Sequence, residues 1–477
     1  MKVLFAASEA LPFKSSGGLA EVAGSLPKAL RRRLVGVRVV MPLYDSIAQE
    51  LRDSMKFLTH LVVPVAWRRQ YCGVFEARAN GVIYYLLDNQ YYFKRGNQIY
   101  GHYDDAERFA FFSRAVLEIL PLLEGFRPDV IHCNDWQSAL VPVYQTAFYG
   151  HDPFYQGIKT VFTIHNIEYQ GQYDMGILTE VFGLGGEFKS LVEHGGCVNL
   201  MKGAIECADA VTTVSPTYAE EILTQYYSHG LDSILNRRKF KLSGILNGID
   251  TDSYNPETDC SIAHNYSLED PSGKEECKRA LQECFGLAQD ANAPLIGMVT
   301  RLVAHKGVDL ARAKLDEMLR HSNAQLVVLG TGDAVYEDFF RGLAGRFPGR
   351  VGVCIDFIPA LSRQIYAGAD IFLMPSKSEP CGLSQMIALR YGAIPVVRET
   401  GGLKDTVQDS GTGGGNGFTF HDFNADELLR TVFRAIQGYA DREGWQILRR
   451  RAMECDNSWA QSAGAYLKLY KGLAGQG

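Results

Sequence analysis

The chain has 477 residues, of which 46% are hydrophobic and 21% are charged, and its formal net charge at pH 7 is -6. These proportions are typical of globular proteins and exclude a disordered or fibrous chain. The negative charge argues against a protein that binds nucleic acid through a broad basic surface. Because single hydrophobic cores stop growing near about 250–300 residues, we expect two domains.

The ten cysteines are scattered, and no pair has Cys-x-x-Cys spacing. This pattern indicates free thiols in a reducing compartment rather than a disulfide framework. The apolar segment 3–7 is shorter than the roughly 7–15 residues of a signal-peptide core and is closed by Glu9. Apolar runs of the ~18 residues that a membrane span requires are absent from the sequence. We therefore expect a cytoplasmic protein without a membrane partner.

Short apolar runs alternate with helical patterns along the chain, which predicts βαβ units and an α/β fold. Such unbroken apolar strands are typical of parallel sheets that are covered on both faces. The predicted strands are 3–7, 37–42, 130–133, 160–165, 210–214, 295–300, 325–329, 351–356, 371–374 and 394–397. Runs at 58–67, 71–78 and 82–87 predict an inserted β-meander.

We place the joint after Phe240, where a basic and poorly periodic segment leads into a second strand–helix series. This gives two doubly wound domains, at 1–240 and 241–455, and the final helix, about 456–477, is expected to pack back on the first domain. Open α/β sheets bind ligands beyond the carboxyl ends of their strands, so we expect the active cleft between two facing domains.

A glycine turn, Gly17-Gly18, separates the first predicted strand from a helix. Without Cβ atoms the backbone N–H groups can approach a ligand, and a helix N-terminus favours an anion such as a diphosphate. The alternative is a tight connection without a ligand. Arg301 and Lys306 follow the strand 295–300, where two cations can hold a diphosphate; the alternative is a solvated pair at a helix start.

The segment Glu379-Pro380-Cys381-Gly382 follows another apolar strand. A carboxylate in this turn could accept hydrogen bonds from sugar hydroxyls or stabilise positive charge at an anomeric carbon. Gly382 is predicted to open a helix. Cys381 could be a nucleophile, but no histidine is near it in sequence, so a contact role is favoured.

Asp135 and His165 follow two neighbouring strands of the first domain, which predicts that both face the ligand. Asp250 and Asp252 have the spacing of a divalent-metal site, but the surrounding turn and the two-domain architecture argue against a metal. Histidines and cysteines with zinc-site spacing are absent. We therefore expect neither a metal nor a cofactor.

These residues resemble the bacterial glycogen synthases, relatives of the plant starch synthases, over essentially the full chain. The stretches that carry the resemblance are Ser16–Val22, Tyr103–Phe109, Phe162–Asn166, Tyr169–Gly171, Thr213–Tyr218, Asn247–Asp250, Arg301-Leu302, Lys306-Gly307, Glu379–Leu383 and Thr400–Thr406. The resemblance implies the GT-B fold of two Rossmann-like domains and a metal-independent, retaining transfer of glucose from ADP-glucose to the non-reducing end of an α-1,4-glucan.

The resemblance also implies site residues. Arg301 and Lys306 match the diphosphate pair, and Glu379 matches the essential carboxylate beside the glucose, with Cys381 and Gly382 next to it. Asp135 and His165 match active-site positions of the other domain. Further matches are Gly18 in the phosphate turn, Asn247 as a substrate contact, and Phe357 where a tyrosine commonly stacks on adenine.

The sequence departs from the family motif around the first glycine turn. The motif's lysine is displaced one step to Lys14, Ser15 stands in its place, and Glu21 replaces an aspartate. Two alternatives stay open: another GT-B sugar-nucleotide enzyme, such as a hexosyltransferase or an epimerase, and a catalytically impaired glucan-binding relative. Three further questions stay open. They are whether the donor is ADP-glucose or UDP-glucose, whether the transfer passes through a covalent intermediate or by attack on the face that the leaving group vacates, and whether the chain forms a homo-oligomer.

Overall fold

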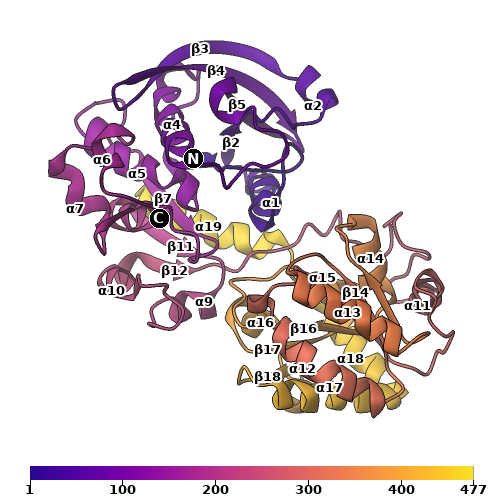
Figure 1. Cartoon of the computed structure of the whole chain (residues 1–477). Helices are drawn as coiled ribbons and strands as arrows, with labels where there is room; N and C mark the ends of the chain where they lie inside the picture. Colours follow the sequence, from indigo (N-terminus) through magenta and orange to yellow (C-terminus); the bar gives the residue numbers. More distant parts are fainter. Residues whose placement is uncertain (476–477) are drawn as a thin grey trace. The chain divides into compact units, whose positions relative to one another are not determined.

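The computed structural model describes residues 1–475, which form two compact units (Figure 1). Unit 1 consists of Met1–Asn247 and the C-terminal segment from Trp459, and unit 2 of Gly248–Ser458. The joint thus lies later than the expected position after Phe240, because Leu242–Gly244 forms a strand, β12, that pairs in parallel with β11 of unit 1. Within residues 1–475, no helix is long and apolar enough to cross a membrane.

Unit 1 is built on a nine-stranded sheet in the order β12-β11-β7-β6-β1-β2-β5-β4-β3. The predicted meander forms antiparallel β3, β4 and β5, and β5 pairs in parallel with β2, so the insertion extends the main sheet. The strand bounds are Lys2–Ala6 (β1), Gly36–Pro42 (β2), Lys56–Val65 (β3), Arg68–Ala79 (β4), Val82–Asp88 (β5), Val130–Asn134 (β6), Lys159–Ile164 (β7), Ala210–Thr213 (β11) and Leu242–Gly244 (β12).

Helices cover this sheet, and a small sheet of β8 (Gln172–Tyr173), β9 (Glu193–His194) and β10 (Cys197–Asn199) lies beside it. The helices are α1 (Gly18–Arg32), α2 (Gln49–Asp53), α3 (Gln90–Phe93), α4 (Asp105–Glu118), α5 (Leu140–Tyr144), α6 (Ile177–Glu180), α7 (Lys189–Val192), α8 (Leu200–Cys207), α9 (Pro216–Glu221), α10 (Asp232–Arg237) and α19 (Trp459–Leu473).

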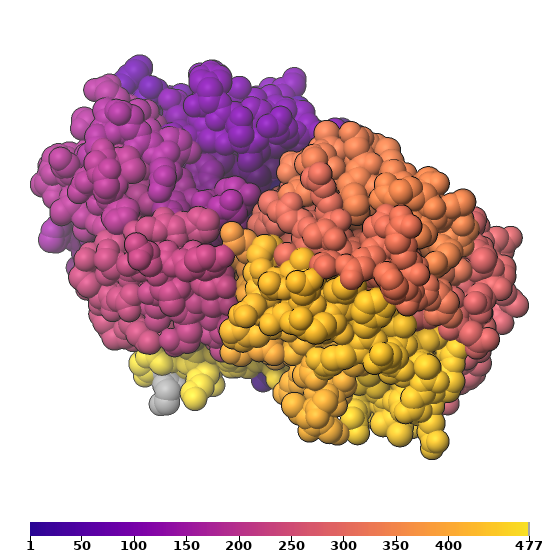
Figure 2. Space-filling model, turned by 60° about the horizontal axis from the view of Figure 1, so that its bottom comes forward, coloured from indigo at the N-terminus to yellow at the C-terminus, as the bar shows by residue number. Residues whose placement is uncertain are grey.

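The last helix, α19, packs against α1, and Figure 2 shows yellow C-terminal residues beside the magenta part of unit 1. A buried histidine ties this helix to the sheet. His132 of β6 is hydrogen-bonded to the Tyr470 hydroxyl at 2.7 Å and to Thr163 Oγ1 at 2.6 Å. Burial lowers the pKa of His132 to about 3, so the ring is neutral at pH 7.

Unit 2 contains a six-stranded parallel sheet in the order β15-β14-β13-β16-β17-β18, which is the doubly wound arrangement. The strands are Leu295–Val299 (β13), Gln325–Leu329 (β14), Val351–Cys354 (β15), Ile371–Met374 (β16), Ile394–Arg398 (β17) and Phe418–Phe420 (β18). The helices are α11 (Ser272–Cys284), α12 (Val308–Arg320), α13 (Ala334–Arg346), α14 (Pro359–Gly368), α15 (Ser384–Arg390), α16 (Gly401–Thr406), α17 (Ala425–Ala440) and α18 (Arg442–Glu454).

Both faces of the unit-2 sheet are buried, which explains its unbroken apolar strands. Ile296 of β13 belongs to a large core with residues of α12, α17 and α18. Its neighbour Leu295 points to the opposite face and packs with Leu281 of α11 and Ile365 of α14. Because β13 and β16 are neighbours, the loops that follow their carboxyl ends lie side by side.

Candidate active site

In unit 2 the loops after β13 and β16 bring a cation and a carboxylate together. Lys306 Nζ lies 2.7 Å from Glu379 Oε2, and Ser376 donates a hydrogen bond of 3.0 Å to the same oxygen. The side chains of Lys306 and Glu379 are 17% and 8% exposed. Arg301, by contrast, is exposed at the end of β13. Lys306 therefore contacts Glu379 directly, a contact that the sequence did not predict.

A glycine makes this close approach of the two loops possible. Gly307 has φ +74°, and a Cβ at this position would lie 1.9 Å from the carbonyl oxygen of Pro375. The amide of Lys377 donates a hydrogen bond of 2.9 Å to the His305 carbonyl, which joins the same two loops. Only glycine fits at position 307, both in backbone conformation and in space.

The turn that carries Glu379 also rests on a glycine pair, Gly401-Gly402. The Gly402 amide donates a 3.2 Å hydrogen bond to the Glu379 carbonyl. A Cβ at Gly401, which has φ +44°, would lie 2.0 Å from that carbonyl oxygen, and a Cβ at Gly402 would lie 2.1 Å from the Cys381 carbonyl. The main chain of Glu379 is thus held in place by its contacts with Gly401 and Gly402.

The expectation that Gly382 opens a helix is wrong. Gly382 has φ +72°, a left-handed conformation, and α15 begins at Ser384. A Cβ at Gly382 would lie 2.4 Å from Gln385 Oε1, so the glycine serves the turn itself. Cys381 beside it is 5% exposed.

In unit 1, Asp135 and His165 lie together at the carboxyl ends of β6 and β7. Asp135 accepts a 2.8 Å hydrogen bond from the His165 amide, and its φ of +54° is unusual for a residue with a side chain. Burial raises the pKa of Asp135 to about 7 and lowers that of His165 to about 3. At pH 7 the imidazole is neutral, and Asp135 is close to the midpoint of its titration.

The tautomer of His165 follows from its neighbour Asn134. The side-chain amide of Asn134 donates to the carbonyls of Ala6 and His132 at 3.0 and 3.3 Å, so its oxygen faces His165. His165 Nε2 lies 2.9 Å from that oxygen and therefore carries the proton. Nδ1 is left as the hydrogen-bond acceptor of the ring.

The first glycine turn is anchored by a residue that sequence reasoning did not select, Glu9. Its carboxylate is 3% exposed and accepts a hydrogen bond from the Ser16 amide. Burial raises the pKa of Glu9, while the Ser16 amide and the other hydrogen bonds to the carboxylate lower it. The signal that could have indicated this role is a charged residue within three positions of the end of a buried strand, β1.

Gly17 and Gly18 are exposed at the start of α1, and a Cβ at either would have no described atom within 4 Å. Their lack of side chains therefore does not serve packing. Lys14 and Glu21 are partly buried and Ser15 is exposed. The turn and the helix N-terminus behind it leave room for an anionic group.

Comparisons with known proteins match the whole chain. The starch synthase catalytic domain family matches residues 2–237, and the glycosyl transferases group 1 family matches residues 283–448. The glycogen synthase of Geobacillus thermodenitrificans is 54% identical over 99% of this chain and 98% of that protein. That of Bacillus anthracis is 50% identical over 99% of this chain and 100% of that protein.

The chain belongs to the glycogen synthase family.

Solved structures agree with this membership. The catalytic domain of starch synthase IV from Arabidopsis thaliana, bound to ADP and acarbose, matches with a TM-score of 0.92 and 38% identity over 99% of both chains. A sucrose-phosphate synthase from Thermosynechococcus elongatus, at 16% identity and a TM-score of 0.63 over both full chains, shares the fold. The predicted family, the GT-B fold and the predicted class of enzyme, a hexosyltransferase, are confirmed.

Three further candidate residues of this glycogen synthase family member are Asn247, Phe357 and Asp250. Asn247, the last residue of unit 1, is 6% exposed, and its Oδ1 has no hydrogen-bond partner among the described residues. Phe357, after β15 of unit 2, is 83% exposed. Asp250 accepts a 3.0 Å hydrogen bond from the amide of Asp252, so it closes a turn, and residues 1–475 contain no group of three or more potential metal ligands.

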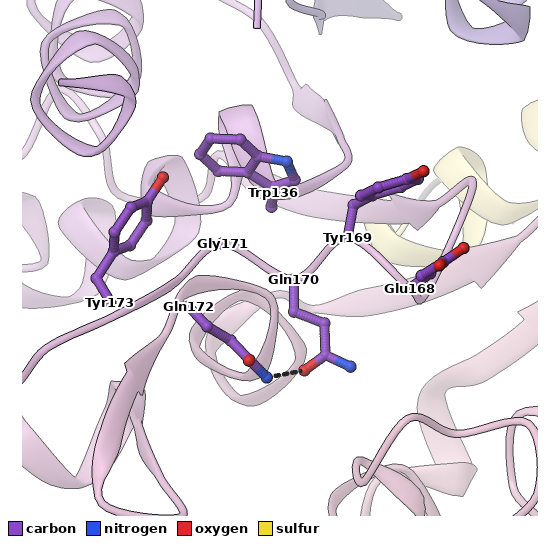
Figure 3. Close-up of a pocket in the computed structure, with 7 residues that line it drawn as sticks. All are labelled: Trp136, Glu168, Tyr169, Gln170, Gly171, Gln172 and Tyr173. Atoms are coloured by element: carbon purple, nitrogen blue, oxygen red, sulfur yellow. Dashed lines mark hydrogen bonds between the residues drawn. The ribbon is translucent and has the colours of Figure 1, made fainter. Parts of the chain in front are cut away.

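An aromatic pocket of about 290 Å³ lies in unit 1 (Figure 3), and Trp136, the residue that follows Asp135 in the chain, is part of its wall. Trp136, Tyr169 and Tyr173 line it, and Gln172 Nε2 donates a hydrogen bond of 2.8 Å to Gln170 Oε1 in its wall. Gly171 in the same wall has φ +66°, and a Cβ there would lie 2.8 Å from the Trp136 ring. Aromatic rings combined with amide and carboxylate groups suit a sugar ligand.

Proposed function

We propose that this chain transfers glucose from ADP-glucose to the non-reducing end of an α-1,4-glucan with retention of configuration at C1. The observation that carries the proposal is the buried Lys306–Glu379 pair at the carboxyl edge of the unit-2 sheet. It is supported by the full-length similarity to glycogen synthases and by the starch synthase solved with ADP and acarbose. The named relatives favour this reaction over an epimerase.

In the proposed reaction the bond between C1 and a phosphate oxygen breaks, and its electron pair leaves with ADP. A bond forms between C1 and the acceptor O4, whose proton passes to a phosphate oxygen. Arg301, Lys306 and the amides near Gly18 would stabilise the diphosphate charge, and Lys306 has three donors, enough for both Glu379 and a phosphate. The Glu379 carboxylate would stabilise positive charge at C1.

We assign the remaining candidates as follows. The neutral His165 would accept a hydrogen bond from a sugar hydroxyl at Nδ1, and Asp135 would supply negative charge near the glucose. Phe357 offers an exposed ring for adenine, and the unpartnered Oδ1 of Asn247 offers an acceptor for the substrate. Lys14, Ser15 and Glu21 would surround the phosphate turn.

The test is transfer of labelled glucose. The enzyme is incubated with labelled ADP-glucose or UDP-glucose and glycogen, and label is counted in the precipitated polysaccharide. We expect incorporation from ADP-glucose, little from UDP-glucose, and a loss of incorporation in Glu379→Gln. Release of free glucose, or a changed sugar nucleotide, without labelled glycogen would contradict the proposal. The ten free cysteines favour a cytoplasmic location for this reaction.

A further inference from the structure

Unit 1 has a second pocket, of about 280 Å³, that adjoins the aromatic pocket lined by Trp136. The two pockets share Tyr173 as a lining residue. The second one is lined by Tyr103, Asp104, Ala106, Glu107, Tyr173, Asp174, Ile177 and Val181. Tyr103 is 90% exposed, so its ring stands free of the packed core. The two pockets are therefore neighbours that meet at Tyr173.

The wall of the second pocket leads to the turn between β3 and β4, which carries Trp67. Arg68 lies under the Trp67 ring, 4.5 Å from the ring centroid. The same guanidinium is 3.2 Å from Glu107 and donates a 2.7 Å hydrogen bond to the carbonyl of Glu180, at the end of α6. Arg68 thus joins the turn that carries Trp67 to the wall of the second pocket.

The packing around this turn leaves the indole itself uncovered. Gly183, with φ +66°, lies so close that a Cβ there would be 3.0 Å from Ala66 Cα, so the turn is held in place by the loop after α6. Trp67 is nevertheless 72% exposed. A tryptophan left exposed on a closely packed turn is unusual on a surface without a ligand, because its burial would be strongly favourable.

The aromatic residues form a track that begins one residue from the candidate active site. Trp136 directly follows Asp135, and its ring is 6.1 Å from that of Tyr173. Tyr173 leads to Tyr103 in the second pocket, and Glu107 and Arg68 lead from there to Trp67. We name these four aromatic residues, Trp136, Tyr173, Tyr103 and Trp67, the aromatic track.

We propose that the distal end of the aromatic track, Trp67 and Tyr103, binds the acceptor glucan several glucose units away from its reacting end. This rests on the proposed function and names a second contact for its substrate. Sugar rings present apolar C–H faces to aromatic rings and hydroxyls to carboxylates, and Asp104, Glu107 and Asp174 border the track. These acids also disfavour a polyanionic ligand.

The experiment compares a short and a long acceptor in the full chain. Values of kcat/KM are measured for maltotriose and maltoheptaose at saturating ADP-glucose. In Trp67→Ala and in Tyr103→Ala we expect the maltoheptaose to maltotriose ratio to fall by about two- to tenfold, which is the range of one lost aromatic contact. Trp67→Phe, which keeps an aromatic ring, should recover most of the ratio.

Phe240 provides the matched control, because it is an exposed aromatic residue of the same unit, 80% exposed, that precedes β12 at the other end of the sheet. Phe240→Ala should leave the ratio unchanged. Migration in a native gel that contains glycogen gives a readout independent of turnover, and Trp67→Ala should be retarded less than wild type. The inference would be overturned if the maltoheptaose to maltotriose ratio were unchanged in Trp67→Ala and Tyr103→Ala, which includes an equal fall of kcat/KM for both acceptors. It would also be overturned if glycogen retarded Trp67→Ala and wild type equally. A wild type that labels neither acceptor contradicts the proposed function instead.

Discussion

Lys306 donates a 2.7 Å hydrogen bond to Glu379 across 73 positions of the sequence. The two residues meet because β13 and β16 are adjacent in the sheet although β14 and β15 separate them in the chain. Both side chains are largely buried, so the pair is little screened by solvent. The arrangement holds the carboxylate in one place before any substrate binds.

We predict that Glu379→Gln lowers kcat by roughly 10²- to 10³-fold, because it removes the charge that would stabilise the transition state.

Lys306→Met should lower the free energy of unfolding by about 3 kcal/mol, since it leaves the buried carboxylate of Glu379 without its cationic partner. In the double variant that combines Glu379→Gln with Lys306→Met, the loss in the free energy of unfolding should be smaller than the sum of the losses in the two single variants. Urea unfolding and steady-state kinetics measure these effects. Strict additivity would mean that the two residues do not interact.

Asp135 predicts a pH dependence near neutrality, because burial raises its pKa to about 7. We expect kcat/KM to rise between pH 6 and 8 as the carboxylate ionises. Asp135→Asn should be slower and flat over this range. The raised pKa means that the folded state holds the proton more tightly, so the contribution of Asp135 to stability is lost as pH rises from about 4 to 7. Asp135→Asn should therefore gain stability relative to wild type as the pH rises.

Glu9 is expected to act as a positioning residue for the first glycine turn. Glu9→Ala removes the acceptor of the Ser16 amide, and KM for ADP-glucose should rise about tenfold with a smaller change in kcat. Glu9→Gln keeps an acceptor oxygen and should retain most of the affinity. The charge of Glu9 raises the pKa of Asp135, so Glu9→Gln should also move the inflection of the pH profile to lower pH. An unmoved inflection would show that the two carboxylates are not coupled.

The buried His132 predicts acid sensitivity of the fold. Its pKa is about 3 in the folded chain and near 6.5 when unfolded, so the unfolded state binds more protons in between. The stability that His132 contributes is present above pH 6.5 and falls by about 1.4 kcal/mol per unit as pH decreases below it. In denaturant titrations, the advantage of wild type over His132→Gln should shrink from pH 7 to pH 5. The exposed His264→Gln serves as the control and should leave the pH dependence as it is in wild type.

Much of the fold was predictable because burial on both faces leaves an unbroken apolar run. The predicted strands 325–329 and 371–374 coincide with β14 and β16. The short edge strand β12, Leu242–Gly244, is half-buried and has no such run, so the joint was placed too early. Edge strands obtain their stability from one neighbour, and the sequence pattern does not show which one.

The site was predictable only in part, for a related reason. Arg301, Lys306 and Glu379 each follow an apolar strand, so their place at the carboxyl edge of a sheet could be inferred. The contact between Lys306 and Glu379 depends on the order of the strands, which the sequence does not contain. Glu9 was missed because its role depends on the Ser16 amide, which reaches it only in the folded turn.

Gly307 and Gly18 both lie in stretches that carry the family resemblance, but their physical roles differ, and alanine substitutions should distinguish these roles. At Gly307 a Cβ would meet the Pro375 carbonyl at 1.9 Å with φ +74°, so Gly307→Ala should lower the free energy of unfolding by about 1–3 kcal/mol or more and displace the Glu379 loop. At Gly18 the space is open, and alanine is a better helix former than glycine. Gly18→Ala should therefore melt at or above the wild-type temperature.

In Gly18→Ala the affinity for ADP-glucose should fall although the stability of the fold does not. A methyl group at Gly18 would occupy space that a phosphate needs, so KM for ADP-glucose should rise severalfold in Gly18→Ala while the fold is intact. Thermal melting and KM are measured on the same preparation. If Gly18→Ala bound ADP-glucose as well as wild type does, the glycine turn would be a tight connection only, and the diphosphate would depend on Arg301 and Lys306 alone.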